Sequence, residues 1–180
     1  MVNVMKKLFS LSVLSLALLS GNALAANGEI RFIGAVTDVT CNLVPSVGGS
    51  VNNTIQLGTA SLTTPADEVH FSLKSDMLAD CSALQDDDVV NIAFMGPLND
   101  TGLANQSGLA TDAFVEIKSV NATATADNAN IIKQGSDKRA FKGSLFSTAG
   151  AAGAQFTAQL KGKTQQGDYQ SALAFVVAYM

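Results

Sequence analysis

Short apolar segments with a period of two recur along almost the whole chain. In each segment alternate residues are apolar, as in a strand that buries one of its faces. Stretches rich in Gly, Asn, Asp and Ser separate the segments and favour turns. Many short strands joined by turns predict an all-β sandwich, and one or two helical turns are expected only within residues 76–84. The alternating segments cover residues 29–36, 53–57, 69–73, 89–95, 113–119, 141–146, 155–160 and 171–179.

The first 25 residues have the pattern of a secretory signal peptide. Lys6 and Lys7 precede an apolar run over residues 8–19, and residues 23–25 read Ala-Leu-Ala, an A-x-A cleavage pattern. The apolar run has twelve residues, too few for the roughly 20 that a membrane-spanning helix needs. We therefore expect export and cleavage after Ala25. The remaining 155 residues are enough for one domain with its own core.

The composition argues against several classes of function. Loss of Lys6 and Lys7 changes the formal charge from -4 to -6. A mature chain with this negative charge and so few basic residues is not expected to bind nucleic acid. The single histidine, His70, has no second metal ligand at a suitable spacing. No G-x-S-x-G motif and no Gly-rich phosphate loop occur. We therefore expect no enzyme, no metal and no cofactor.

Two cysteines, Cys41 and Cys81, remain in the exported chain. In an oxidising compartment they are expected to form one disulfide, and the alternative is a pair of buried thiols. Closing a loop of about 40 residues would stabilise the fold by roughly 4 kcal/mol on the chain-entropy account.

The chain ends on an apolar strand instead of a polar tail. Within residues 167–180 one face of a period-two pattern carries Tyr169, Leu173, Phe175, Val177 and Tyr179. Such a strand has to be paired and covered. If its partner is not in the same chain, its edge and the neighbouring groove become a binding place for another polypeptide.

A second alternating segment begins the mature chain. Ile30, Phe32, Gly34 and Val36 share one face of an extended segment within residues 26–36. One interpretation is an ordinary first strand of the sandwich with Gly34 at a bulge. The other is a strand offered to a different molecule.

Together these features resemble the pilin subunits of the chaperone/usher pathway. The matching features are the alternating segment 30–36 shortly before Cys41, the second cysteine Cys81, Gly167 fourteenth from the end, and the penultimate Tyr179. The resemblance covers the whole mature chain and is closest to major subunits of enterobacterial fimbriae, including those whose repeating subunit binds host glycans.

The resemblance implies an incomplete immunoglobulin-like β-sandwich over residues 37–180 that lacks its final strand. Residues 26–36 would be a donor-strand extension, with Ile30, Phe32 and Val36 as apolar plugs and Gly34 where the groove is shallow. A periplasmic chaperone would fill the groove first, and the extension of the next subunit would replace it at an outer-membrane usher. The groove and chaperone-binding strand would use Gly167, Tyr169, Leu173, Phe175, Val177 and Tyr179.

The chain is not expected to fill its own groove. Only residues 37–40 separate the donor face from Cys41, and four extended residues reach at most about 14 Å. We therefore expect identical subunits to complement one another head to tail, which generates a filament on the bacterial surface.

Positive charge is concentrated at Lys133, Lys138, Arg139 and Lys142. These side chains could contact acidic sugars of a host glycan, or form an ordinary solvated face. Three other functions stay open: a major subunit that itself binds host glycans, a minor adaptor pilin, and a free secreted carbohydrate-binding module. Aromatic residues make up only 6% of the chain and tryptophan is absent, which disfavours the last of these.

Overall fold

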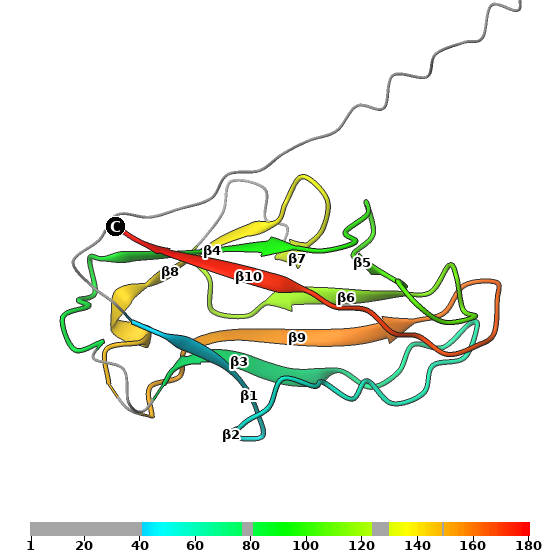
Figure 1. Cartoon of the computed structure of the whole chain (residues 1–180), viewed down its shortest axis with the longest axis horizontal. Helices are drawn as coiled ribbons and strands as arrows, with labels where there is room; N and C mark the ends of the chain where they lie inside the picture. The colour runs from blue at the N-terminus through cyan, green and yellow to red at the C-terminus, as the bar shows by residue number, and fades with distance from the viewer. Residues whose placement is uncertain (1–40, 77–80, 124–129, 149) are drawn as a thin grey trace, which may run out of the picture. The chain divides into compact units, whose positions relative to one another are not determined.

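The computed structural model describes residues 41–180 except for residues 77–80, 124–129 and 149. All of the described residues belong to one compact unit. These described residues form ten strands and one short 3-10 helix (Figure 1). They are β1 (Leu43–Val47), β2 (Ser50–Val51), β3 (Val69–Ser75), β4 (Val89–Met95), β5 (Leu103–Ala104), β6 (Phe114–Ser119), β7 (Ile131–Ile132), β8 (Lys138–Lys142), η1 (Gly143–Leu145), β9 (Ala154–Lys161) and β10 (Ala174–Tyr179).

The strands form two antiparallel sheets. The larger sheet has the order β2-β1-β3-β9-β6-β5, with β7 also paired to β6. The smaller sheet has the order β10-β4-β8, so the C-terminal strand β10 lies at its edge. The expected all-β sandwich is confirmed. The chain forms an incomplete immunoglobulin-like sandwich in which no described strand continues the smaller sheet beyond β10.

Aromatic side chains from both sheets fill the centre of the sandwich. The Phe156 ring on β9 stacks on Phe71 of β3 at 5.2 Å and meets Phe94 of β4 edge-on at 5.5 Å between ring centroids. Phe141 on β8 also meets Phe156 edge-on at 5.6 Å, and Phe146 extends the cluster. Phe141, Phe146 and Phe156 have no exposed surface. Such pairs add to the stabilisation from burial and hold the sheets together.

Several predicted strands differ from the observed ones. Residues 89–95 are confirmed as β4, and β6, β9 and β10 fall within three residues of their predicted bounds. Residues 141–146 are wrong as one strand, because β8 ends at Lys142 and η1 follows. Residues 53–57 are also wrong as a strand, because no backbone partner among the described residues pairs with them.

Candidate functional site: an apolar groove beside the C-terminal strand

The strand β10 is paired along only one of its edges. Its residues pair with β4 from Ala174 opposite Met95 to Tyr179 opposite Val90. In the described part of the chain no strand pairs with its other edge. The backbone groups of this edge are therefore available to a further strand.

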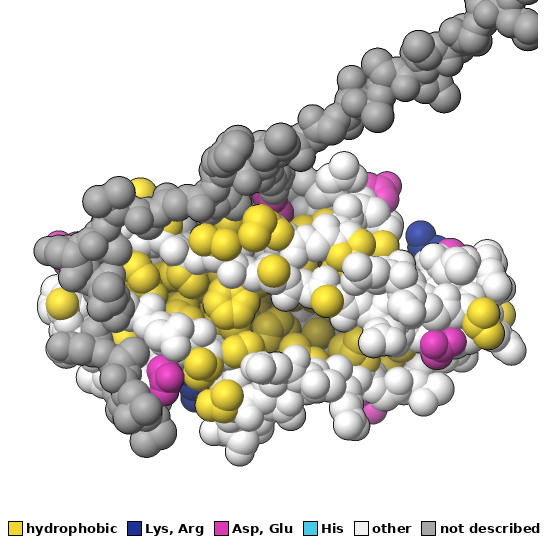
Figure 2. Space-filling model, in the orientation of Figure 1, with side chains coloured by type: hydrophobic (Ala, Val, Ile, Leu, Met, Phe, Trp, Pro, Cys, Tyr) yellow, Lys and Arg dark blue, Asp and Glu magenta, His cyan; other side chains and the backbone are white. Residues whose placement is uncertain are grey.

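An apolar groove of about 280 Å³ lies beside β10. Figure 2 shows the hydrophobic side chains gathered in this hollow. The C-terminal segment forms one wall of the groove with the side chains of Tyr169, Leu173 and Phe175. The floor and far wall consist of Pro45, Asn53, Ile55, Leu57, Phe71, Leu73, Phe94, Leu103, Val115, Ile117 and Ala158.

The predicted face of the C-terminal segment points into the sandwich. Tyr169, Leu173, Phe175, Val177 and Tyr179 are all half-buried and pack against the core. A strand that finished an ordinary sandwich would bury this face fully. The partial exposure indicates that no described element covers the sandwich beside β10.

Residues 53–57 line the groove although they are not a strand. Ile55 and Leu57 are half-buried and reach the groove, whereas Thr54 and Gln56 are exposed. The alternation in the sequence therefore predicts correctly which side chains turn inward. It does not predict whether the backbone has a pairing partner.

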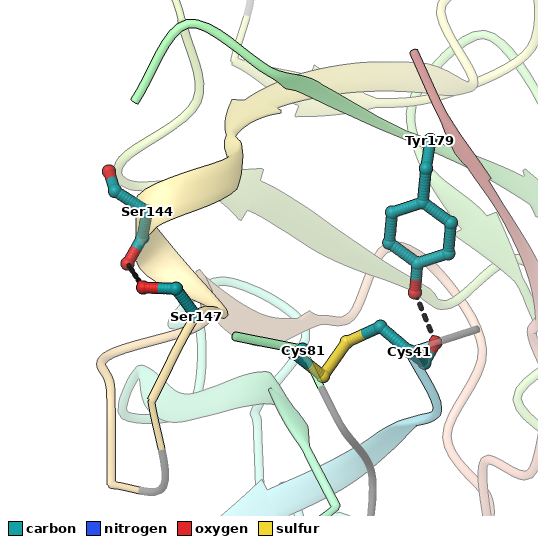
Figure 3. Close-up of a disulfide and its surroundings, with 5 residues drawn as sticks. All are labelled: Cys41, Cys81, Ser144, Ser147 and Tyr179. Atoms are coloured by element: carbon teal, nitrogen blue, oxygen red, sulfur yellow. Dashed lines mark hydrogen bonds between the residues drawn. A yellow bond between two sulfur atoms is a disulfide. The ribbon is translucent and has the colours of Figure 1, made fainter. Parts of the chain in front are cut away.

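The two tyrosines bond to the backbone of the larger sheet from two points ten residues apart. Before β10, the Tyr169 hydroxyl donates to the carbonyl of Leu103 at 3.0 Å. At the end of β10, the Tyr179 hydroxyl donates to the carbonyl of Cys41 (Figure 3). These bonds fix both ends of the C-terminal segment relative to the larger sheet, so the width of the groove is held between them.

The expected disulfide joins Cys41 and Cys81, and both cysteines are buried. Figure 3 shows it next to the Tyr179 hydroxyl. The disulfide closes 40 residues of chain and anchors the residue that receives the Tyr179 bond. The penultimate tyrosine and the disulfide therefore act on the same backbone carbonyl.

Gly167 lies where two loops come into close contact. A Cβ atom at this position would be 2.5 Å from Cβ of Leu109 and 2.6 Å from the amide nitrogen of Ala110. No side chain fits there without movement of the loop backbone. The Asp168 carboxylate accepts a hydrogen bond from the Leu109 amide at 3.1 Å, which holds the two loops together. Glycine at this position therefore allows the segment that leads into Tyr169 to pack closely against the loop at Leu109 and Ala110.

Burial raises the pKa of both tyrosines to about 12, and for Tyr169 the nearby Ser171 hydroxyl opposes the rise. The ordinary value is near 10. Because folding raises these pKa values, the associated stability is complete below about pH 10 and is lost as the pH rises towards 12.

We therefore expect only about a tenth of the two tyrosines to be ionised in the folded protein at pH 11. The chain has two tyrosines and no tryptophan, so the ultraviolet difference spectrum reports on Tyr169 and Tyr179 alone. The same protein in denaturant should titrate near pH 10. A folded protein that titrates with the denatured curve would show that these hydroxyls are not held as described.

The basic residues do not form one open surface. The guanidinium of Arg139 points inward and donates to the carbonyls of Ile131, Ser136 and Lys138, and only 3% of the residue is exposed. The expectation of a glycan contact at Arg139 is therefore wrong, because its bonding capacity is used to link β8 to β7 and the following turn.

The three lysines of the predicted cluster have separate surroundings. Lys142 pairs with Asp86 at 2.7 Å. Lys138 is exposed at the other end of β8, and Lys133 is half-buried. Lys138 and Lys142 lie on a solvated edge of the smaller sheet and are not gathered around a common pocket. Their contact with a glycan stays a prediction.

The predicted donor face lies outside the described residues. Ile30, Phe32, Gly34 and Val36 therefore stay a sequence prediction. The described part of the chain also contains no group of three or more potential metal-ligating side chains. Within that same part no helix is long and apolar enough to cross a membrane.

Sequence reasoning missed the floor of the groove. Phe94 and Leu103 line it, together with Ile117 on β6. The alternation within their strands marks these residues as inward-facing. It could not separate a position under the groove from one in the closed core, because that difference depends on which strand is absent above it.

The open edge and the groove define a class of protein: a sandwich subunit whose smaller sheet can accept one more strand. The chain is 37% identical over 176 residues to the F107 fimbrial protein of Escherichia coli, covering 97% of this chain and 99% of that protein. It is 28% identical to the K99 fimbrial protein of Escherichia coli, with the same coverage. Among solved structures, the P pilus rod subunit PapA matches 86% of this chain and 100% of that chain, with a TM-score of 0.48 and 17% identity. No family model matches the chain.

The chain belongs to the fimbrial protein family. It is a structural subunit that polymerises into a cell-surface fimbria.

Proposed function

We propose that each subunit binds the N-terminal segment of its neighbour in the groove beside β10. The observation that carries this proposal is the apolar groove along an unpaired strand edge. Strand addition satisfies the backbone groups of that edge, and alternate side chains of the added strand enter the groove.

The donor segment matches the groove in length and pattern. The six residues of β10 span roughly 20 Å, and residues 30–36 span about 23 Å when extended. Ile30, Phe32 and Val36 would fill the groove, each contributing roughly 1.5 to 3 kcal/mol when fully buried. Gly34 would lie where the groove is shallow and a side chain would clash.

The position of Cys41 sharpens the argument against self-filling. Cys41 lies at the Tyr179 end of β10, and only the four residues 37–40 separate it from the donor face. A chain that filled its own groove would therefore run in the same direction as β10. All pairs in both sheets are antiparallel, and parallel pairing is slightly weaker per residue. The segment of a neighbour has no such constraint, so head-to-tail exchange is favoured.

The subunit needs a partner before assembly. An exposed apolar groove next to an open edge favours aggregation. A periplasmic chaperone that fills the groove after export, followed by an outer-membrane usher that replaces it with the next subunit, meets this need. Residues 1–25 would direct that export and residues 26–36 would remain as the donor strand.

The fibre is a homopolymer of this chain, which has no catalytic role and supports bacterial attachment to host cells. Shaft formation is the main function, and contact of the subunit itself with host glycans would be an additional one.

We expect electron microscopy of cells that lack only this protein to show no fimbrial shaft. Restoring the chain from a plasmid should restore the shafts, which controls for effects on neighbouring genes. Fibres that persist in shortened or sparse form would instead identify the chain as a minor adaptor subunit.

A further inference from the structure

One polar atom in the apolar groove beside β10 has no partner. Ser171 lines the groove shortly before β10 begins, and its hydroxyl oxygen is buried. Within the described part of the chain this oxygen makes no hydrogen bond. The nearby Tyr169 hydroxyl donates instead to the carbonyl of Leu103 at 3.0 Å. Buried hydroxyls in folded proteins normally have a partner, so this one points to a polar group that arrives when the groove is filled.

The donor strand can meet the C-terminal segment in only a few registers. This step rests on the function proposed above, in which a segment of a neighbour fills the groove and runs antiparallel to β10. In such a pair each inward-facing residue of one strand lies opposite an inward-facing residue of the other. A slip of one residue would turn the apolar face of the donor strand outward, so registers that keep the pattern differ by two residues.

The single glycine of the donor face favours one of these registers. Among the residues of β10 only Phe175 lines the groove, and its ring takes up space there. A donor side chain directly opposite this ring would compete with it for that space, whereas Gly34 would not. With Gly34 opposite Phe175, Ile30 lies opposite Tyr179, the last residue of β10. This register therefore also uses the full length of the strand.

We propose that Asp38 of one subunit accepts a hydrogen bond from the Ser171 hydroxyl of the subunit whose groove it enters, and that this bond fixes the register of the donor strand. Asp38 is four residues after Gly34, and Ser171 is four residues before Phe175, so the register above sets them opposite each other. Side chains directly opposite in an antiparallel pair have Cβ atoms about 4.5 to 5.5 Å apart, which is within reach of a short hydroxyl and a carboxylate. A hydrogen bond to a carboxylate is stronger than one between neutral groups.

The two neighbouring registers leave a polar group buried without a partner. If the donor strand lay two residues deeper, the Asp38 carboxylate would face Leu173 in the apolar part of the groove, where an unpaired charge is costly. If it lay two residues further out, Val36 would cover the Ser171 hydroxyl and leave it unsatisfied. Only the intermediate register pairs polar with polar and apolar with apolar. The pair therefore marks where insertion of the donor strand is complete.

Dissociation of purified intact fimbriae in hot detergent tests the contribution of the bond. Ser171→Ala and Asp38→Ala should each speed the release of monomers roughly tenfold, the size of one lost hydrogen bond to a charged group. The double variant should dissociate no faster than the faster single variant, because either change alone removes the bond. Thr37→Ala, on the opposite face of the segment, is the matched control and should dissociate as wild type.

Pairs of cysteines in the full chain test the register. Fimbriae with Asp38→Cys and Ser171→Cys should give a ladder of covalent multimers on non-reducing gels, because opposing residues are close enough for a disulfide. Val36→Cys with Leu173→Cys samples the same register without a new thiol three residues from Cys41, and it should give the same ladder. Val36→Cys with Ser171→Cys lies on the diagonal, where the Cα atoms are too far apart, and should give none.

The outcomes separate this inference from strand exchange itself. A ladder from Val36→Cys with Ser171→Cys alone would overturn the register and leave strand exchange in place. The inference is also overturned if Ser171→Ala and Asp38→Ala fimbriae both dissociate as wild type, and this test still decides if a cysteine pair prevents assembly. A failure of strand exchange has a different signature, because fibres would then form from a chain that lacks residues 26–36.

Discussion

Fimbriae are expected to disappear completely when residues 26–36 are deleted from a chain that keeps its signal peptide. The deletion leaves the groove beside β10 intact but removes the segment that we propose fills the groove of the neighbouring subunit. Loss of three buried apolar side chains and a full strand of backbone hydrogen bonds is too large for the remaining contacts to replace. Electron microscopy and the yield of sheared fibres from the cell surface measure the result.

The matched control uses the opposite face of the same segment. Arg31 alternates with the groove-facing residues, so Arg31→Gln should assemble normally, whereas Phe32→Asp should not. The deleted chain should still be recovered bound to the chaperone, because its own groove is unchanged. Fibres of normal length from the deleted chain would rule out residues 26–36 as the donor strand.

The face of each strand could be predicted more reliably than its pairing. Residues 89–95 were delimited correctly as β4, because a long alternating run between turn residues specifies a half-buried strand. Residues 53–57 have the same kind of pattern and turn Ile55 and Leu57 inward, yet they have no pairing partner in the described chain. Alternation depends on burial, which a groove provides, whereas strand assignment depends on a hydrogen-bonding neighbour.

The strands that the alternation does not predict are short or have an interrupted apolar pattern: β1, β2, β5 and β7. The first strand, β1, contains Pro45 and a buried serine, Ser46. Its apolar alternation is therefore too weak to detect. Arg139 shows the opposite error, because a charged residue in a basic run is normally exposed. Its burial follows from the carbonyls of the turn before β8, which only the folded chain brings within reach.

The donor and acceptor halves of the site also differ in how far the sequence could define them. The five apolar residues of the C-terminal segment could be placed on one face from their spacing alone. The groove floor is assembled from β3, β4, β6 and β9, which are distant in sequence. No local pattern marks which inward-facing residues of those strands lie under the missing strand.

Removal of the disulfide is expected to lower the free energy of unfolding by about 4 kcal/mol in the double variant Cys41→Ser and Cys81→Ser. Loss of the cross-link over 40 residues increases the conformational freedom of the unfolded chain. The loss should also weaken strand acceptance, because the Cys41 carbonyl that receives the Tyr179 hydroxyl is no longer anchored. Denaturant unfolding of the chaperone-released subunit with a peptide of residues 26–38, corrected for the binding free energy of the peptide, measures the first effect. The affinity for that peptide measures the second.

Tyr179→Phe separates the two effects. It removes the hydroxyl that bonds to Cys41 but keeps the ring and the disulfide, so it should cost only about 0.5 to 1.5 kcal/mol of stability. If the disulfide acts only on the unfolded chain, the double serine variant will bind the peptide as tightly as wild type despite its lower stability. If it also holds the end of the groove, both variants will bind the peptide more weakly, and the serine variant will be the weaker. Equal stability and equal peptide affinity of wild type and the serine variant would show that the cross-link contributes to neither.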